Sequence, residues 1–339
     1  MKAPPWAAEE AARHIQDILA IAVEHSQPRK AVVVFDTGCE LAVLLAGAYR
    51  HALPEAAFID FDVIPPAAVL AAFEPLKPQD LVVLIQTTSF RLDAFRIRVE
   101  LFQRGLKVIE HPHLLRMQGE QIGWYVDALA YDPGYYRRVG AALKEKIDGA
   151  KGGAIESDGE SLIIASGFEP AKLNVGDYRA MKNVGGQFPI GEVFTEAKDL
   201  EAVNGRIAIF AFADADFSPN KPERPITLTV AKGRVTEVSD STPAFDQVLA
   251  AIRADEGQVW VRELGFGLNR AFSPERMVND IGTLERMLGM HLSLGAKHAV
   301  YSKPGFGRKH GKHHVDVFAA ADKVVLEGEA VFWDGAWRA

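Results

Sequence analysis

His314 and Asp316 are separated by a single residue within the run 309–318. If this run forms a strand, both side chains point to the same face, about 7 Å apart along the backbone. An imidazole and a carboxylate held side by side are two ligands for one divalent cation. Five of the ten histidines lie between His291 and His314. We therefore expect the chemistry of this chain in its C-terminal third.

Three further candidate ligands, Glu192, Glu263 and His291, lie among apolar residues and glycines. A carboxylate buried in such surroundings is destabilising unless a positive charge compensates it. A metal ion compensates several carboxylates at once. The joint occurrence of these residues in one half of the chain therefore predicts a metal site.

Each of these residues also has a purely structural interpretation. Glu192 could be a surface or helix-capping residue, and Glu263 could pair with Arg262 or Arg270. His291 taken alone is typical of a hydrogen-bonded core histidine. Their joint occurrence favours the metal site over three separate structural explanations.

Other polar motifs fit structural roles better. The run 36–40 lacks the glycine spacing of a nucleotide-binding loop and is typical of an ordinary β-to-α turn. His111 and His113 are expected in a loop at the end of a strand, with a metal pair as the alternative. His310 and His313 lie in a basic loop and are expected to face solvent or an anion.

Length and composition exclude several classes of protein. A chain of 339 residues exceeds the usual size of one hydrophobic core and predicts two domains. A net charge of -7 argues against a nucleic-acid partner, and the single cysteine, Cys39, excludes an internal disulfide. No run reaches the roughly 18–20 apolar residues of a membrane span, and no signal-peptide pattern opens the chain. We expect a cytoplasmic protein with no membrane partner.

The N-terminal half predicts an α/β domain. Four short apolar runs alternate with helix-like segments: 31–35, 57–61, 81–85 and 106–110. Continuous apolar strands between helices indicate a mostly parallel sheet that is buried on both faces. The polar, glycine-rich stretch 149–159 predicts a boundary between domains at 1–150 and 160–339.

The C-terminal half has a different pattern. Its predicted strands and hairpins lie at 161–166, 206–213, 226–238 and 316–333, and its predicted helices at 243–254 and 275–288. Strands joined by short turns favour antiparallel pairing, so we expect an α+β domain here.

Four segments in this half resemble motifs of the M29 metallopeptidases, the family of aminopeptidase T and aminopeptidase S: 191–195, 263–269, 291–295 and 314–316. The resemblance covers about residues 180–339 and implies an aminopeptidase T-like fold with a metal-binding C-terminal domain. It also implies ligands for two divalent metal ions, zinc or cobalt, at Glu192, Glu263, His291, His314 and Asp316.

The chain departs from this family at one place near the metals. Where the peptidases carry a tyrosine, this sequence has His298, with Tyr301 three residues later. In length the chain is more similar to the 2,5-dihydroxypyridine 5,6-dioxygenases, which share the fold. Those enzymes bind one Fe(II) through the His-x-Asp pair and a histidine where this chain has Glu263. A ring-cleaving iron enzyme and a non-catalytic peptide-binding or assembly protein are therefore the alternatives.

The peptidase resemblance implies a hydrolase that acts on peptides with a free amino terminus. Glu192 is then expected to be a bridging ligand or a base, and Tyr301, His298 or Lys303 to stabilise the oxyanion. A peptide or another small molecule is the expected partner. The resemblance further implies a homodimer.

Overall fold

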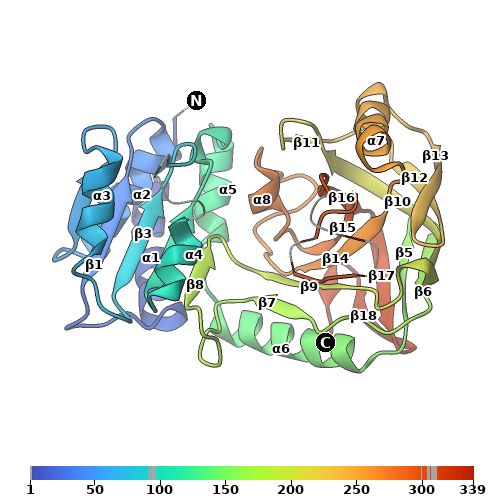
Figure 1. The fold of residues 1–339 in the computed structure, drawn as a ribbon, viewed down its shortest axis with the longest axis horizontal. Helices are drawn as coiled ribbons and strands as arrows, with labels where there is room; N and C mark the ends of the chain where they lie inside the picture. The colour runs from blue at the N-terminus through green and yellow to red at the C-terminus, as the bar shows by residue number, and fades with distance from the viewer. Residues whose placement is uncertain (1, 91, 93–96, 299, 304–305, 307–310) are drawn as a thin grey trace. The chain divides into compact units, whose positions relative to one another are not determined.

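The computed structural model describes residues 2–90, 92, 97–298, 300–303, 306 and 311–339 (Figure 1). His310, which we expected to face solvent or an anion, lies outside the described residues. The chain divides into two compact units. The first consists of Met1–Arg137, Gly176–Ile190 and Val278–Thr283, and the second of Arg138–Val175, Gly191–Met277 and Leu284–Ala339. Both units are discontinuous, whereas the sequence predicted the continuous ranges 1–150 and 160–339.

The first unit contains a five-stranded sheet in the order β2-β1-β3-β4-β8, in which every neighbouring pair is parallel. The strands are β1 (Ala31–Phe35), β2 (Ala57–Asp60), β3 (Leu81–Ile85), β4 (Lys107–His111) and β8 (Gly185–Gln187). The central strand β3 is buried at every residue, because helices cover both faces of the sheet. The parallel sheet expected from the apolar runs is confirmed.

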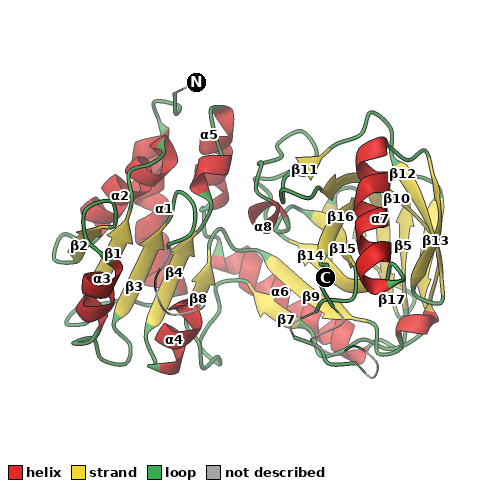
Figure 2. Cartoon of the chain, turned by 45° about the horizontal axis from the view of Figure 1, so that its top comes forward, coloured by secondary structure: helices red, strands yellow, loops and turns green. Residues whose placement is uncertain are grey.

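The helices of this unit cover the two faces of the parallel sheet (Figure 2). Its helical segments are α1 (Ala7–Asp17), η1 (Ile18–Ala22), α2 (Glu40–Ala52), α3 (Pro66–Phe73), α4 (Ile97–Gln103), η2 (Leu114–Arg116) and α5 (Glu120–Ala128). Phe73 of α3 and Leu101 of α4 pack against Val34 and Leu84 in one core cluster. Helices α1 and α2 pack together on the opposite face.

The second unit is built on a large antiparallel sheet. Its main path runs β19-β18-β17-β5-β6-β10-β16-β15-β14-β9-β7; β11 and β12 also pair with β10, and β13 pairs with β12. The strands that begin this unit are β5 (Gly153–Ser157), β6 (Glu160–Ile164), β7 (Lys172–Asn174), β9 (Glu192–Glu196), β10 (Val203–Ala213), β11 (Pro219–Asn220), β12 (Ile226–Ala231) and β13 (Arg234–Ser239). The later strands are β14 (Val261–Gly267), β15 (Gly289–Leu294), β16 (Val315–Ala319), β17 (Ala321–Leu326), β18 (Glu329–Trp333) and β19 (Ala336–Trp337).

Four helical segments complete the chain: α6 (Pro133–Gly149), η3 (Leu200–Ala202), α7 (Pro243–Glu256) and α8 (Ile281–Leu284). Helix α7 begins with Thr242 as its N-cap, whose hydroxyl accepts a bond from the Phe245 amide, and ends at Gly257 with a positive φ. The antiparallel pairing that we expected for this half is confirmed. In the described part of the chain, no helix combines the length and the apolar character that crossing a membrane requires.

The helix predicted over 275–288 is wrong in most of its length, because only the short α8 forms there. The backbone that follows α8 bonds instead to Asn269. The Asn269 amide donates to the Arg286 carbonyl (2.8 Å), and the Leu288 amide donates to the Asn269 carbonyl (3.2 Å). These long-range bonds replace the i to i−4 bonds that a helix would need.

Candidate metal centre

Strands β9, β14, β15 and β16 are neighbours in the antiparallel sheet and carry most of the predicted ligands. The register places Gly267 opposite Glu192, Gly265 opposite His291, and Ser293 opposite Asp316. Residues directly opposite one another share a face of the sheet, and so do residues two apart along a strand. Glu192, His291 and Asp316 therefore lie on one face.

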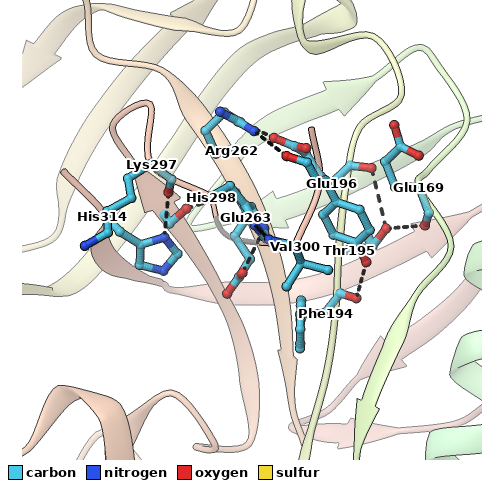
Figure 3. A network of polar contacts seen from close by, with 12 residues as sticks. Glu169, Phe194, Thr195, Glu196, Arg262, Glu263, Lys297, His298, Val300 and His314 are labelled. Atoms are coloured by element: carbon cyan, nitrogen blue, oxygen red, sulfur yellow. Dashed lines mark hydrogen bonds and ion pairs between the residues drawn. The ribbon is translucent and has the colours of Figure 1, made fainter. Parts of the chain in front are cut away.

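Strand alternation brings Glu263 into this site, because Glu263 lies two residues from Gly265 on β14 and pairs with Glu196 in a regular register, and a bulge next to it displaces Arg262. Val261 pairs with Leu294 and Leu264 with Leu292, so two residues of β14, Arg262 and Glu263, lie opposite one residue of β15. A bulge re-aims side chains that would alternate in a regular strand. Arg262 consequently pairs with Glu196, whereas Glu263 lies beside His298, as Figure 3 shows.

Glu192, Glu263 and His291 bring their ligand atoms within 4.8 Å of one another, and all three residues are buried. The His291 Nε2 atom lies 3.5 Å from Glu192 Oε1 and 3.7 Å from Glu263 Oε1. Two ligands about 2.1 Å from one tetrahedral ion are roughly 3.4 Å apart. These separations therefore match the edges of a metal coordination shell.

A second group shares His291 with the first. Glu285, His291 and Asp316 also bring their ligand atoms within 4.8 Å of one another. His314 adjoins this group, because its Nε2 atom lies 3.2 Å from Asp316 Oδ1. The structure thus brings together the five predicted ligands and adds Glu285, which the sequence interpretation missed because it lay within the predicted helix 275–288.

Two ligand atoms of these groups lack hydrogen bonds. His291 Nε2 is buried and has no hydrogen-bond partner among the described residues; Asp316 Oδ1 is also buried and makes no well-aligned hydrogen bond, although His314 Nε2 lies 3.2 Å away. Buried polar atoms are nearly always bonded, so such exceptions point to an ion or another group that binds them. Carboxylate oxygens and imidazole nitrogens together suit divalent zinc, cobalt or iron. The residues present therefore fit a metal centre.

The charges of these groups act strongly on one another. Burial raises the pKa of Glu192, although Arg286 and His291 oppose this effect. Burial acts against the charge of Glu263 as well, but its contacts with His291 and His298 hold its pKa below the usual value. Burial disfavours the His314 cation, yet the Asp316 carboxylate outweighs it and raises the pKa of His314 to about 10. Without a metal ion, the protons on His314 and His291 therefore balance the negative charge of the neighbouring carboxylates, which a bound cation would otherwise balance.

Gly265 makes room for the shared histidine. A Cβ atom at position 265 would lie 2.0 Å from His291 Cε1 and 2.1 Å from His291 Nε2. No side chain fits there unless the imidazole moves away from the carboxylates. The glycine of this motif is therefore a steric requirement of the site.

Arg286 also contacts the acidic groups. Its guanidinium lies 3.8 Å from Glu192 Oε2 and forms an ion pair with Glu285. Its side chain is buried, so this positive charge acts on the two carboxylates with little screening.

The structural alternatives for single residues are wrong where the structure tests them. Glu192 is 4% exposed, which excludes a surface role. Arg262 does not pair with Glu263 but forms a buried ion pair with Glu196, and it donates to the Ala296 carbonyl at 2.7 Å. By contrast, the expectation that His313 faces solvent or an anion is confirmed, because this residue belongs to neither ligand group and pairs with the Asp255 carboxylate at 2.7 Å.

The structure places two predicted oxyanion donors against other protein groups. The Tyr301 hydroxyl donates to the Pro170 carbonyl at 2.8 Å. Lys303 pairs with Glu169 and donates to the Lys198 carbonyl at 2.8 Å. The catalytic role of Tyr301 stays a prediction, and it would require the hydroxyl to leave this carbonyl.

Comparisons with known proteins address the fold. No family model matches the chain, and no curated protein matches its sequence. The solved structure of wild-type AmpT from Thermus thermophilus is similar, with a TM-score of 0.60 and 13% sequence identity. The likeness covers 98% of this chain and 99% of that one. It supports an M29-like fold of a parallel-sheet unit and an antiparallel-sheet unit.

Proposed function

We propose that this chain is a metal-dependent, aminopeptidase-like hydrolase that acts on peptides with a free amino terminus. The observation that carries the proposal is the pair of ligand groups that share His291. Two ligand groups this close together could hold two neighbouring divalent ions, with a carboxylate and not the histidine between them. The M29-like fold supports the same conclusion, because its likeness extends over nearly the whole chain.

Each ligand group would hold one ion. Glu192, Glu263 and His291 would bind the first ion and Glu285 and Asp316 the second, because the one bare nitrogen of His291 can bind only one ion. His314 would join the second group through its contact with Asp316. When bound, zinc or cobalt ions lower the pKa of water and polarise a carbonyl group. Within the chain, we assign Glu192 the role of bridging ligand or base.

One observation favours a second candidate. His291, His314 and Asp316 are two histidines and one carboxylate, the set that holds iron in many non-haem oxygenases. A single Fe(II) ion bound there would suit a ring-cleaving dioxygenase of the dihydroxypyridine type. This candidate gives no role to the Glu192 and Glu263 carboxylates, and we therefore rank it second.

Metal analysis combined with two assays distinguishes the candidates. The purified chain is stripped of metal, reloaded separately with zinc, cobalt or Fe(II), and its metal content measured. Two zinc or cobalt ions per chain with release of amino-terminal residues from unblocked peptides is the result expected. One iron with oxygen consumption on 2,5-dihydroxypyridine would establish the second candidate. Failure to bind any of these ions contradicts both.

A matched pair of variants links activity to the site. Glu263→Gln removes a ligand charge with little change in size, whereas His313→Ala removes an imidazole that pairs with Asp255 outside the ligand groups. We expect the first change to abolish hydrolysis and the second to leave it within about twofold. We also propose a cytoplasmic homodimer, which light scattering on the metal-loaded chain tests for its oligomeric state.

A further inference from the structure

Two histidines beside the ligand groups bond to the backbone in opposite ways. The Nδ1 atom of His314 lies 3.1 Å from the Lys297 carbonyl oxygen, to which it can only donate a proton. The Nδ1 atom of His298 instead accepts a bond from the Val300 amide at 3.2 Å. Figure 3 shows both imidazoles beside Glu263.

These backbone bonds fix opposite tautomers. A neutral imidazole has one N–H donor and one bare nitrogen, and the bond made by one nitrogen decides the state of the other. His314 donates from Nδ1 to the Lys297 carbonyl, so the nitrogen that would lose its proton to a bound cation is Nε2. His298 has a bare Nδ1, so its Nε2 atom carries the proton and cannot bind a metal in that state.

The Nε2–H of His298 faces the carboxylate of Glu263. Nε2 lies 3.0 Å from Glu263 Oε2, and the His298 side chain is 2% exposed. The pair is within hydrogen-bond distance without good alignment, which is common in such sites before a ligand binds. The other oxygen, Glu263 Oε1, lies on the side of His291, at 3.7 Å from its Nε2 atom.

Aromatic neighbours hold the His298 ring in this orientation. The ring centroids of Tyr301 and Phe194 lie 5.0 Å and 6.4 Å from that of His298. The Tyr301 hydroxyl is in turn bonded to the Pro170 carbonyl, which fixes the tyrosine ring. The imidazole is therefore supported on one side by a residue that is itself anchored.

We infer that His298 is a positioning residue of the metal centre and not a further ligand. Its Nε2–H holds Glu263 Oε2, which turns Glu263 Oε1 toward the ion that Glu192 and His291 share. The inference rests on the proposed metal site. Carboxylate ligands are commonly oriented by such donors, and loss of one costs about 10–100-fold in metal affinity.

The tautomer of His298 can be measured directly, without any metal. Long-range nitrogen–proton correlation spectra of the chain labelled with ¹⁵N-histidine distinguish a protonated Nδ1 from a protonated Nε2. His298→Gln and His314→Gln assign the two rings by loss of their signals. In the metal-free chain we expect His298 to carry its proton on Nε2 and not on Nδ1, and His314, whose pKa is raised to about 10, to carry protons on both nitrogens. A proton on Nδ1 of His298 would overturn the inference.

Zinc titration of the same sample extends this test. The Nε2 signal of His314 should shift to the range of a metal-bound nitrogen, while that of His298 should keep its attached proton. A metal-bound shift for His298 would make it a ligand and overturn the inference. If no histidine responds to zinc, cobalt or iron, the proposed metal site fails, and the tautomer result for His298 still stands separately.

Metal affinity of two variants separates positioning from packing. The side-chain amide of Gln carries an N–H donor near the place of Nε2, whereas Leu at 298 keeps the bulk without a donor. We expect His298→Leu to lose about 10–100-fold in zinc affinity by calorimetry and His298→Gln to recover most of it. His313→Ala is the matched control and should bind zinc as the wild type does. Equal losses in both 298 variants would contradict the donor role.

Discussion

His111 in the parallel sheet and His291 in the antiparallel sheet are equally buried, at 0% and 1% exposure, yet have opposite chemistry. His111 lies between two tyrosines, with Nε2 2.9 Å from the Tyr49 hydroxyl and Nδ1 2.8 Å from the Tyr125 hydroxyl. Tyr125 donates to the Phe188 carbonyl, so it accepts from His111. Burial lowers the pKa of His111 to about 3, which keeps the ring neutral.

His291 has carboxylates where His111 has hydroxyls. Burial disfavours its cation, but Glu263, Glu192 and Asp316 outweigh burial and raise its pKa. Its Nε2 atom has no hydrogen bond among the described residues, whereas both nitrogens of His111 are bonded. Burial alone therefore does not separate a structural histidine from a ligand. The charge of the neighbours and the completeness of the hydrogen bonds do.

The largest effect on metal content should come from removing ligands next to His291 in the antiparallel sheet. We expect His314→Ala combined with Asp316→Ala to abolish retention of the second metal ion, because both removed groups adjoin it. Metal content after gel filtration measures this. Circular dichroism should show a folded chain, since the parallel-sheet unit contains neither residue. Full metal content in the double variant would refute the assignment.

A change at His111 should act on stability alone. His111→Leu leaves the Tyr49 and Tyr125 hydroxyls facing an apolar side chain. We expect a loss of about 2–4 kcal/mol in the free energy of unfolding, measured in urea, with unchanged metal content. A drop in metal content would contradict the purely structural role that we assign to His111.

Gly265→Ala tests the space around His291 without removing a ligand. The added methyl group would overlap the imidazole, which must turn away from Glu192 and Glu263. We expect a loss of roughly tenfold or more in zinc affinity by calorimetry. The comparison change Gly257→Ala, at the end of α7, should affect stability and leave the affinity as it is. Unchanged affinity in Gly265→Ala would mean that the strand relaxes to accept the methyl group.

The last prediction concerns how His111 and His314 change the pH dependence of the free energy of unfolding. His111 titrates near 6.5 when unfolded and near 3 when folded, so its stabilising effect is lost as pH falls from 6.5 to 3. His314 titrates near 10 in the metal-free fold, so its effect is present below 6.5 and lost as pH rises toward 10. Urea unfolding of His111→Leu and His314→Gln against the wild type should show these opposite slopes. Equal slopes in the wild type and His314→Gln above pH 6.5 would contradict the Asp316 pairing.

The parallel-sheet unit could be predicted closely from the sequence. β1 and β3 coincide with the apolar runs 31–35 and 81–85, because a strand buried on both faces needs apolar residues throughout. Helix α5 was not predicted, since Gly123 weakens its helical pattern; the glycine is needed because a Cβ there would lie 3.1 Å from the Trp6 ring.

The site could be predicted only in part, since the sequence indicates ligand types and not long-range partners. Strand alternation indicated the His-x-Asp pair, although β16 begins only at Val315, and the family motifs indicated the remaining predicted ligands. Glu285 could not be predicted, because apolar residues at helical spacing disguised an irregular segment that bonds to Asn269. The role we infer for His298 depends on a single backbone amide, that of Val300, which no sequence pattern indicates.

The bulge in β14 has a consequence for how sequences of this kind can diverge. Deleting one residue between Val261 and Leu264 would restore regular pairing with β15. It would also remove either the Arg262–Glu196 ion pair or the Glu263 carboxylate. The side chains next to the deletion would then move to the other face of the sheet. This stretch can therefore accept substitutions more readily than changes in length. A related chain that is one residue shorter here should lack either the buried ion pair or the carboxylate ligand of this strand.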